Sequence, residues 1–286
     1  MQDARCAPDA PPRSEESAGQ SLRLHGLHVD LHGPADAPAP PLLLVHGFMA
    51  SRAQWHGNLA RLSRRRRVAV VELLGHGRSD APRDPAAYEV ARYIDAFEAL
   101  RERLGGRRWH LCGQSLGAGI SVSYALARPE SVIAHAFTNS GAVMTHPADA
   151  AKVAERRATA AAIRAGGREK LPEARVHPSR ATRYPPQTLA RLMQDAARLD
   201  PEAMALAMEV TVAGTGAMHR LEALRLPTLL INGRWEKRFQ THLPALRAGI
   251  PHLEVVDLEG GHSINAERPE AFDAALEAFL DRHPGP

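Results

Sequence analysis

The stretch Trp109-His110-Leu111-Cys112-Gly113-Gln114-Ser115-Leu116-Gly117-Ala118-Gly119 decides the fold of this chain. A short apolar run typical of a strand leads into Gly-Gln-Ser-Leu-Gly, and a helical pattern follows through Arg128. Gly-x-Ser-x-Gly between a strand and a helix is the nucleophile-elbow motif, which holds Ser115 on a strained turn and exposes its hydroxyl above the sheet edge. Because glycine and serine are also common in ordinary strand-to-helix turns, the interpretation depends on partners elsewhere in the chain.

Strand and helix signals alternate on both sides of this motif. From Leu22 to Leu31 the apolar residues alternate, which predicts two antiparallel strands. Continuous apolar runs such as Leu42–Val45 are typical of strands buried on both faces. Further central strands are predicted at 68–73, 131–138, 227–232 and 253–257, with helices over 55–62, 88–104, 243–248 and 269–281. The pattern predicts an α/β fold with a mostly parallel central sheet and helices on both faces.

Strand signals stop between about Met144 and Leu221, where Ala-rich helical segments and a basic link, Arg175–Tyr184, take their place. This change inside the α/β alternation predicts an inserted helical cap and not a separate domain. The predicted organisation is a disordered tail at 1–20, a first part of the core at 21–143, the cap at 144–221 and a second part of the core at 222–286.

Two polar side chains follow the last predicted strands. Strand 227–232 runs into Gly233-Arg234-Trp235-Glu236, and strand 253–257 runs into Glu259-Gly260-Gly261-His262. Because the carboxyl ends of parallel strands meet at one edge, we expect Glu236 and His262 to lie beside Ser115. The order of serine, acid and histidine is that of a catalytic triad, in which His262 takes the serine proton and Glu236 orients the imidazole.

Backbone amides near Ser115 are predicted to form an oxyanion hole. The two donors are the N–H groups of Leu116 and of Phe48, which lies on the loop after strand 42–45. Neighbouring side chains on the same loops are predicted to bind substrate: Met49, Gln114 and Trp235.

Each candidate also has a simpler interpretation when it is taken alone. His262 fits a hydrogen-bonded loop histidine, and Glu236, beside Lys237 and Arg238, fits a surface ion pair. Asn139, after strand 131–138, stands where some relatives carry the acid, but an amide cannot be an anionic partner. The joint occurrence of serine, acid and histidine at strand ends favours the catalytic interpretation.

Composition and charge indicate a globular protein and do not indicate a nucleic-acid-binding one. The 286 residues are 44% hydrophobic and 24% charged, with a net charge of +4, which is ordinary for a globular protein. The basic run Arg64–Arg67 has no interleaved aromatic residues, so we interpret it as a solvated helix end and not as a nucleic-acid site.

The remaining composition predicts no metal, no cofactor and no membrane anchor. Cys6 and Cys112 are too few for a disulfide framework, and no metal-ligand spacing occurs. No apolar run approaches the roughly 20 residues of a membrane span, and the N-terminus lacks a signal-peptide pattern. We therefore predict a cytoplasmic protein without membrane or nucleic-acid partners.

The chain resembles the α/β-hydrolase fold superfamily from about Leu22 to Arg282. The resemblance rests on His46-Gly47-Phe48, Gly75-His76-Gly77-Arg78-Ser79, Gly113-Gln114-Ser115-Leu116-Gly117, and Gly261-His262-Ser263 followed by Glu267-Arg268-Pro269-Glu270. It implies the α/β-hydrolase fold with an inserted helical cap and a serine triad, and it says little about the substrate.

A narrower resemblance is to the menaquinone-pathway 2-succinyl-6-hydroxy-2,4-cyclohexadiene-1-carboxylate synthases. It rests on His46-Gly47-Phe48-x-x-Ser51, Gly214-Thr215-Gly216-Ala217 and Gly233-x-x-Glu236-Lys237-x-Phe239. This resemblance implies elimination of pyruvate by the same triad, with Glu236 in place of the usual Asp. The synthases typically carry Tyr before the nucleophile and Arg four residues after it, where this chain has Gln114 and Gly119.

We predict a serine hydrolase that cleaves a carboxylic ester or thioester of a small acyl compound through an acyl-Ser115 intermediate. One alternative is a non-hydrolytic lyase of the synthase type, which uses the same triad for proton abstraction. Another is a non-catalytic binding protein on the same fold. Neither a metal nor an organic cofactor is implied.

Overall fold

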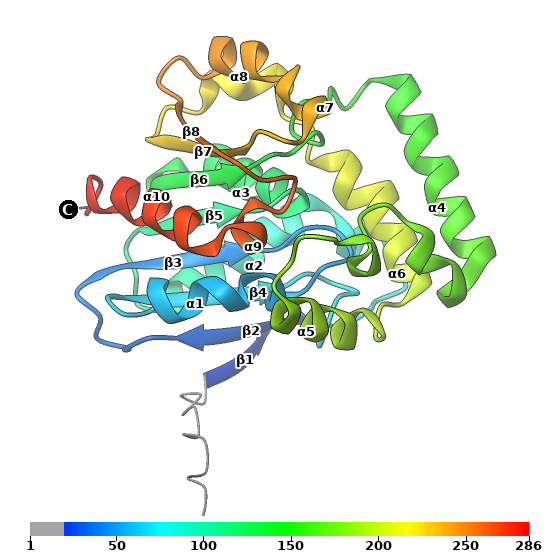
Figure 1. Cartoon of the computed structure of the whole chain (residues 1–286), viewed down its shortest axis with the longest axis horizontal. Helices are drawn as coiled ribbons and strands as arrows, with labels where there is room; N and C mark the ends of the chain where they lie inside the picture. The colour runs from blue at the N-terminus through cyan, green and yellow to red at the C-terminus, as the bar shows by residue number, and fades with distance from the viewer. Residues whose placement is uncertain (1–19, 286) are drawn as a thin grey trace, which may run out of the picture.

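A computed structural model describes residues 20–285 and shows an eight-stranded sheet in the order β1-β2-β4-β3-β5-β6-β7-β8 (Figure 1). Strand β2 is antiparallel to β1 and β4, and all other neighbouring strands are parallel. The strands are β1 Gln20–Leu24, β2 Leu27–His32, β3 Ala39–Val45, β4 Arg66–Glu72, β5 Trp109–Gly113, β6 Val132–Thr138, β7 Thr228–Gly233 and β8 Glu254–Leu258.

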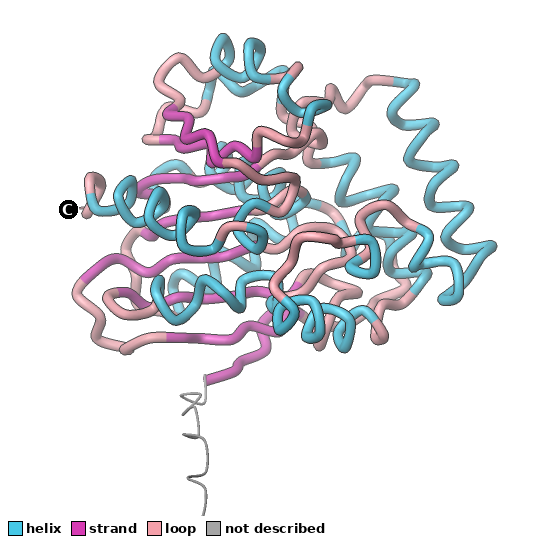
Figure 2. The backbone as a smooth tube through the Cα atoms, viewed as in Figure 1, coloured by secondary structure: helices cyan, strands magenta, loops and turns pink. Residues whose placement is uncertain are grey.

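Helices connect the strands along the chain, as the alternating segments of Figure 2 show. The α-helices are α1 His56–Leu62, α2 Val90–Arg103, α3 Leu116–Ala127, α4 Ala150–Lys170, α5 Pro186–Ala196, α6 Pro201–Leu206, α7 Lys237–Gln240, α8 Leu243–Gly249, α9 Ile264–Glu267 and α10 Pro269–Asp281. Helices α1 and α10 cover one face of the sheet, and α2 and α3 cover the other (Figure 1).

The apolar run in β3 is continuous because both faces of the strand are covered. Leu42 and Leu44 belong to the core that α1 and α10 complete, whereas Leu43 and Val45 belong to the core that α2 and α3 complete. All four side chains are 0% exposed. Successive side chains of a strand point to opposite faces, so a strand between two helical layers needs an apolar residue at every position. The predicted α/β fold with its mostly parallel sheet is confirmed.

Two details of the chain differ from the sequence predictions. The tail predicted at 1–20 lies outside the described residues except for Gln20, which begins β1. The run Arg64–Arg67 is not a solvated helix end, because its second half lies in β4. The Arg66 side chain is 3% exposed and lies 3.1 Å from Asp281 in an ion pair, while Nη1 is 3.4 Å from His110. An ion pair that reaches across to the last helix therefore explains a charge at the start of this strand.

The chain between β6 and β7 contains α4, α5 and α6, which lie beyond the carboxyl ends of the parallel strands (Figure 1). Polar contacts attach α5 to the sheet. Ser51 Oγ donates to Asp195 Oδ2 at 2.7 Å, and Arg52 Nη1 contacts Asp195 at 3.2 Å and Glu72 Oε1 at 2.8 Å. The Glu72 side chain is 0% exposed and that of Asp195 is 11% exposed, so water and salt screen these charges little. These contacts hold α5 over the loop that follows β3.

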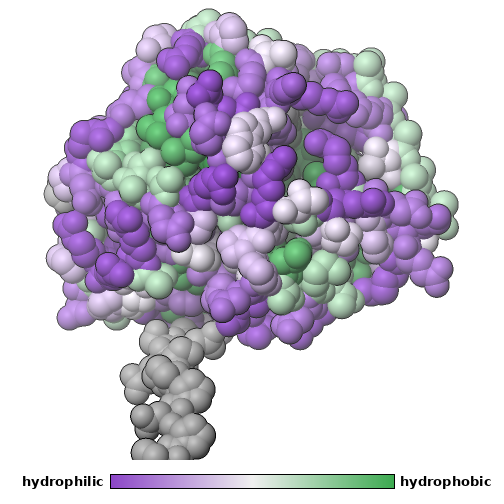
Figure 3. All heavy atoms as spheres, in the orientation of Figure 1, coloured by the Kyte–Doolittle hydropathy of each residue, from purple (hydrophilic) through white to green (hydrophobic). Residues whose placement is uncertain are grey.

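Hydrophilic residues cover most of the face seen in Figure 3, and hydrophobic residues occur there in small separate areas. Within residues 20–285, no helix combines the length and the apolar character needed to cross a membrane.

The buried carboxyl of Asp273 on α10 generates a stability prediction. This residue is 2% exposed, and Asn58 Nδ2 donates to its Oδ1 at 2.8 Å. Burial raises the pKa of Asp273 to about 7, against a reference value of 3.8. The wild-type protein should therefore lose stability as the pH rises from about 4 to about 7, whereas Asp273→Asn keeps an acceptor for Asn58 and removes the ionisable group. A tenfold change in proton affinity corresponds to about 1.4 kcal/mol.

We expect Asp273→Asn to be more stable than wild type by at least about 1 kcal/mol at pH 7.5, with a difference that widens between pH 4 and pH 7. Urea unfolding at pH 4, 5.5 and 7.5 measures this. Exposed Asp36 supplies the matched control, since Asp36→Asn should show no such trend. A difference that does not change with pH would contradict the prediction.

Candidate active site

Ser115 occupies a strained turn between β5 and α3. Its backbone has φ +51° and ψ −107°, a conformation that residues with side chains rarely adopt. The glycines of the motif permit close approach of the backbone. A Cβ on Gly113 would lie 2.4 Å from the carbonyl oxygen of Gly117, and a Cβ on Gly117 would lie 2.2 Å from that of Val45. Both motif glycines are therefore needed where the chain turns sharply from strand to helix.

The structure brings Ser115, His262 and Glu236 into one hydrogen-bonded chain. His262 Nε2 lies 2.9 Å from Ser115 Oγ, and His262 Nδ1 lies 2.8 Å from Glu236 Oε2. When Nδ1 carries the proton, it donates to the carboxylate, and Nε2 is free to accept the Ser115 hydroxyl proton. This arrangement contains the hydrogen bonds that a general base needs to activate a serine.

The loops that carry Glu236 and His262 pack directly against each other. The N–H of Trp235 donates to the carbonyl of Gly260 at 2.9 Å. A Cβ on Gly233 would lie 1.9 Å from the carbonyl oxygen of Gly261, so only glycine fits there. Because β7 and β8 are parallel neighbours, their following loops leave the sheet at the same edge and place the acid beside the histidine.

Asn139, which follows β6, also contacts the acid. Its Nδ2 donates to Glu236 Oε2 and to the carbonyl of Gly233, both at 3.0 Å, and its Oδ1 accepts from Gly233 N–H at 3.0 Å. Burial raises the pKa of the Glu236 carboxyl, but the hydrogen bond and charge of His262, together with Asn139 and Arg175, outweigh burial and lower that pKa below its usual value. Glu236 is therefore ionised at neutral pH.

Two backbone N–H groups beside Ser115 are free of partners within residues 20–285. Leu116 is the first residue of α3, where N–H groups lack an acceptor inside the helix. The amides on either side of Phe48 donate to the side chains of Gln54 and His76, both at 3.0 Å, whereas the Phe48 N–H donates to no described atom. These are the two amides that the sequence predicted as oxyanion donors.

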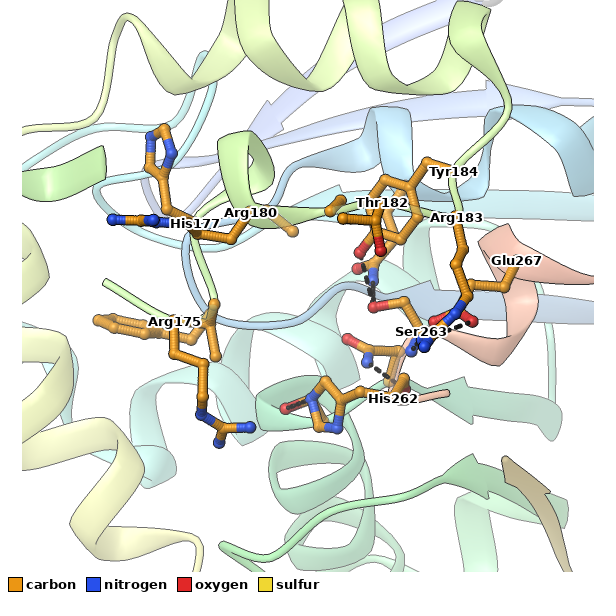
Figure 4. A pocket seen from close by; sticks show the side chains of 16 residues that line it. Arg175, His177, Arg180, Thr182, Arg183, Tyr184, His262, Ser263 and Glu267 are labelled. Carbon is orange, nitrogen blue, oxygen red and sulfur yellow. Dashed lines mark hydrogen bonds and ion pairs between the residues drawn. The ribbon is translucent and has the colours of Figure 1, made fainter. Parts of the chain in front are cut away.

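A cavity of about 160 Å³ lies above Ser115. Phe48, Ala50, Gln114 and His262 line it on the core side, and the link Arg175–Tyr184 lines it on the opposite side (Figure 4). The link was recognised in the sequence as basic and irregular. Its position over Ser115 depends on the path of the chain between β6 and β7, which no local pattern reveals.

Of the three side chains predicted to bind substrate, only Gln114 lines the cavity. Met49 is 1% exposed and belongs to the larger hydrophobic core, to which the sheet, α2, α3 and α6 contribute. Trp235 is 42% exposed and lies on the surface, between the guanidinium groups of Arg183 and Arg268 at 5.2 and 5.3 Å from its ring. The predictions for Met49 and Trp235 are therefore not supported, because adjacency in sequence does not determine which way a loop side chain points.

Within residues 20–285, no three His, Cys, Asp or Glu side chains cluster in a way that could hold a metal ion.

The chain is similar to one protein-family model and to several individual proteins. A family model described as the alpha/beta hydrolase fold matches residues 40–269. A Pseudomonas syringae protein with the provisional name carbamate hydrolase RutD is 30% identical and is aligned over 89% of this chain and 99% of its own. A Bacillus subtilis protein with the provisional name 2-succinyl-6-hydroxy-2,4-cyclohexadiene-1-carboxylate synthase is 25% identical over 84% of this chain and 89% of its own.

A solved structure, that of a hydrolase from Pseudomonas aeruginosa, is also similar. It is 26% identical and aligns with a TM-score of 0.71 over 89% of this chain and 94% of its own.

The close approach at Gly117 generates a prediction about the turn itself. Gly117→Ala places a methyl group 2.2 Å from the Val45 carbonyl oxygen, so β3 or α3 must move. We expect a loss of about 1–3 kcal/mol in the free energy of unfolding, measured by urea denaturation. Gly141→Ala is the matched control, because nothing lies within 4 Å of a Cβ at that position. Equal stability of the two variants would show that the turn tolerates a side chain.

Proposed function

This chain belongs to the α/β-hydrolase family and is an enzyme of that family, and on this premise we propose that it cleaves a carboxylic ester or thioester through an acyl-Ser115 intermediate. The observation that carries the proposal is the hydrogen-bonded chain from Ser115 Oγ through His262 to Glu236 Oε2, at 2.9 and 2.8 Å. Its acid is ionised at neutral pH because its pKa is lowered.

The proposed reaction has two halves, and in each half His262 acts first as a base and then as an acid. His262 Nε2 takes the hydroxyl proton as Ser115 Oγ attacks the carbonyl carbon of the substrate, and Glu236 stabilises the imidazolium that forms. The N–H groups of Phe48 and Leu116 donate to the oxyanion of the tetrahedral intermediate. His262 then protonates the leaving alcohol or thiol. In the second half, His262 takes a proton from water as the water oxygen attacks the acyl carbon, and it gives that proton to Ser115 Oγ as the acyl–Oγ bond breaks.

We also propose that residues 144–221 act as a cap that shapes the substrate pocket. The support is the position of α4, α5 and α6 beyond the strand ends and the presence of the link Arg175–Tyr184 in the cavity wall. Since the cavity measures about 160 Å³, the proposed substrate is a small acyl compound.

The second candidate is a non-hydrolytic elimination in which the same triad abstracts a proton from a carboxylated substrate. The observation that favours it is the arginine-rich side of the cavity, together with the similarity to the protein named as a synthase. It differs from the first candidate in forming no acyl enzyme.

Ser115→Ala removes the attacking oxygen, so we expect hydrolysis of p-nitrophenyl acetate and butyrate to fall to background. Stopped-flow absorbance of wild type should show either a burst of one equivalent or steady turnover. Ser21→Ala, a change on β1 at a side chain that bonds Asp30, should behave as wild type. Folded wild type that turns over neither ester would contradict general ester hydrolysis and would favour the elimination.

Glu236→Gln removes the charge that stabilises the imidazolium and places an amide opposite His262 Nδ1. By comparison with other serine triads, we expect kcat to fall roughly 10³-fold or more, with the fold unchanged by circular dichroism. Glu254→Gln, an exposed change on β8, serves as the charge-matched control. Activity of Glu236→Gln within a few fold of wild type would contradict the role proposed for the acid.

A further inference from the structure

The cavity above Ser115 has a positively charged wall. Arg175, Arg180 and Arg183 line it from the link side (Figure 4). Among the described residues that line the cavity, Glu267 is the one carboxylate. Its side chain is 6% exposed.

The Glu267 carboxylate is engaged within its own loop. Its oxygens accept hydrogen bonds from the N–H groups of Gly261 at 2.8 Å and Ser263 at 3.3 Å. The remaining charge contact is with Arg183, at 3.8 Å, whose guanidinium also lies over the ring of Trp235. The Arg183 guanidinium therefore interacts with Glu267 and with the ring of Trp235. The other two arginines of the wall, Arg175 and Arg180, have no carboxylate partner in the cavity wall.

The Arg175 side chain has no hydrogen bond or ion pair within residues 20–285. The Arg180 side chain has one hydrogen bond there, from Nε to the carbonyl of Pro172 at 3.0 Å. Figure 4 shows the Arg175 side chain extending from the link toward His262. Its charge is close enough to help lower the pKa of the Glu236 carboxyl. A free guanidinium therefore points toward the place where substrate meets the nucleophile.

The link that carries these arginines is held in place by hydrogen bonds. Tyr184 Oη donates to Ser263 Oγ at 2.6 Å and so ties the end of the link to the residue after the triad histidine. The Nε of Arg180 donates to the carbonyl of Pro172 and so ties the middle of the link. The two terminal nitrogens of the Arg180 guanidinium donate to no atom within residues 20–285. Because these hydrogen bonds already hold the link, its arginines lose less conformational entropy on binding an anion than arginines on an unanchored loop would lose.

We propose that Arg175 and Arg180 bind a carboxylate of the substrate, so that the preferred substrates are esters or thioesters that carry a second, ionised carboxyl group. A guanidinium presents donors in a planar fork that matches both oxygens of a carboxylate. The bound carboxylate takes no part in the chemistry: the Ser115 Oγ–acyl bond forms, the ester bond breaks, and His262 supplies the proton of the leaving group. The inference rests on the proposed esterase function for its reaction and on the two arginines for its specificity.

Two matched ester pairs test this preference. The first pair places the carboxylate on the acyl side: p-nitrophenyl hydrogen glutarate against its neutral methyl ester. The second places it on the leaving group: 3-carboxy-4-nitrophenyl acetate against p-nitrophenyl acetate. We expect wild type to show a kcat/KM about 10-fold or more higher for the anionic member of one pair, and the pair that responds identifies the side of the substrate that carries the charge.

The variants compared are Arg175→Gln, Arg180→Gln and the double change, with Arg247→Gln on α8 as control. Arg247 is exposed and lies outside the cavity wall, so this control changes the net charge as much as either single variant. We expect the double variant to lose the preference for the anionic ester, and Arg247→Gln to keep both the preference and the wild-type kcat/KM for the neutral ester. Arg175→Lys should recover part of the preference, and higher NaCl should weaken it.

A binding measurement separates this proposal from the proposed hydrolysis. Calorimetric titration of Ser115→Ala with glutarate should detect an interaction that is lost when Arg175 and Arg180 are also changed to Gln. Equal turnover of both members of each pair, with no glutarate binding, would overturn the carboxylate site and leave the esterase proposal standing. Arginine-dependent glutarate binding without turnover of any ester would support the site and overturn hydrolysis.

Discussion

The close contact between the turn at Ser115 and the end of β3 is the constraint on which the site depends. The backbone at Gly117 passes so near the carbonyl of Val45 that a single methyl group would not fit. This contact lets α3 begin at Leu116, directly after the turn at Ser115. The positive φ of Ser115 is a local strain that the surrounding sheet maintains, so the packing of β3 and β5 holds the Ser115 side chain beside the cavity.

The parallel sheet converts this one turn into a site. Residues separated by more than a hundred positions meet because the loops after β3, β5, β6, β7 and β8 all leave the sheet at the same edge. Each loop contributes a different group: an amide at Phe48, the Ser115 hydroxyl, a hydrogen bond from Asn139, the Glu236 carboxylate and the His262 imidazole. The glycine contact between the last two loops is as restrictive as the one at Gly117. The histidine therefore lies between its partners at hydrogen-bond distance without needing to move.

Charge around the site is arranged in two layers. The inner layer is Glu236, which burial alone would tend to protonate and which His262, Asn139 and Arg175 keep ionised. The outer layer is the basic link, whose arginines exceed the single carboxylate of the cavity wall. Arg175 contributes to both, because one guanidinium near the entrance acts on the acid through space and also faces the cavity. The same side chain thus lowers the pKa of Glu236 and lines the cavity.

The sequence by itself determined the α/β alternation, the turn at Ser115 and the loops that carry Glu236 and His262, because period, glycine spacing and chain order are local properties. Only the tertiary structure decided which side chains face the cavity. Met49 and Trp235 are close to the site along the chain and point away from it, whereas Asn139 and Arg175 are distant along the chain and contact or face it. Arg66 shows the same limit, since its partner Asp281 lies on the last helix. Such contacts depend on strand order and on the path of a long insertion, and neither is encoded in the residues immediately around them.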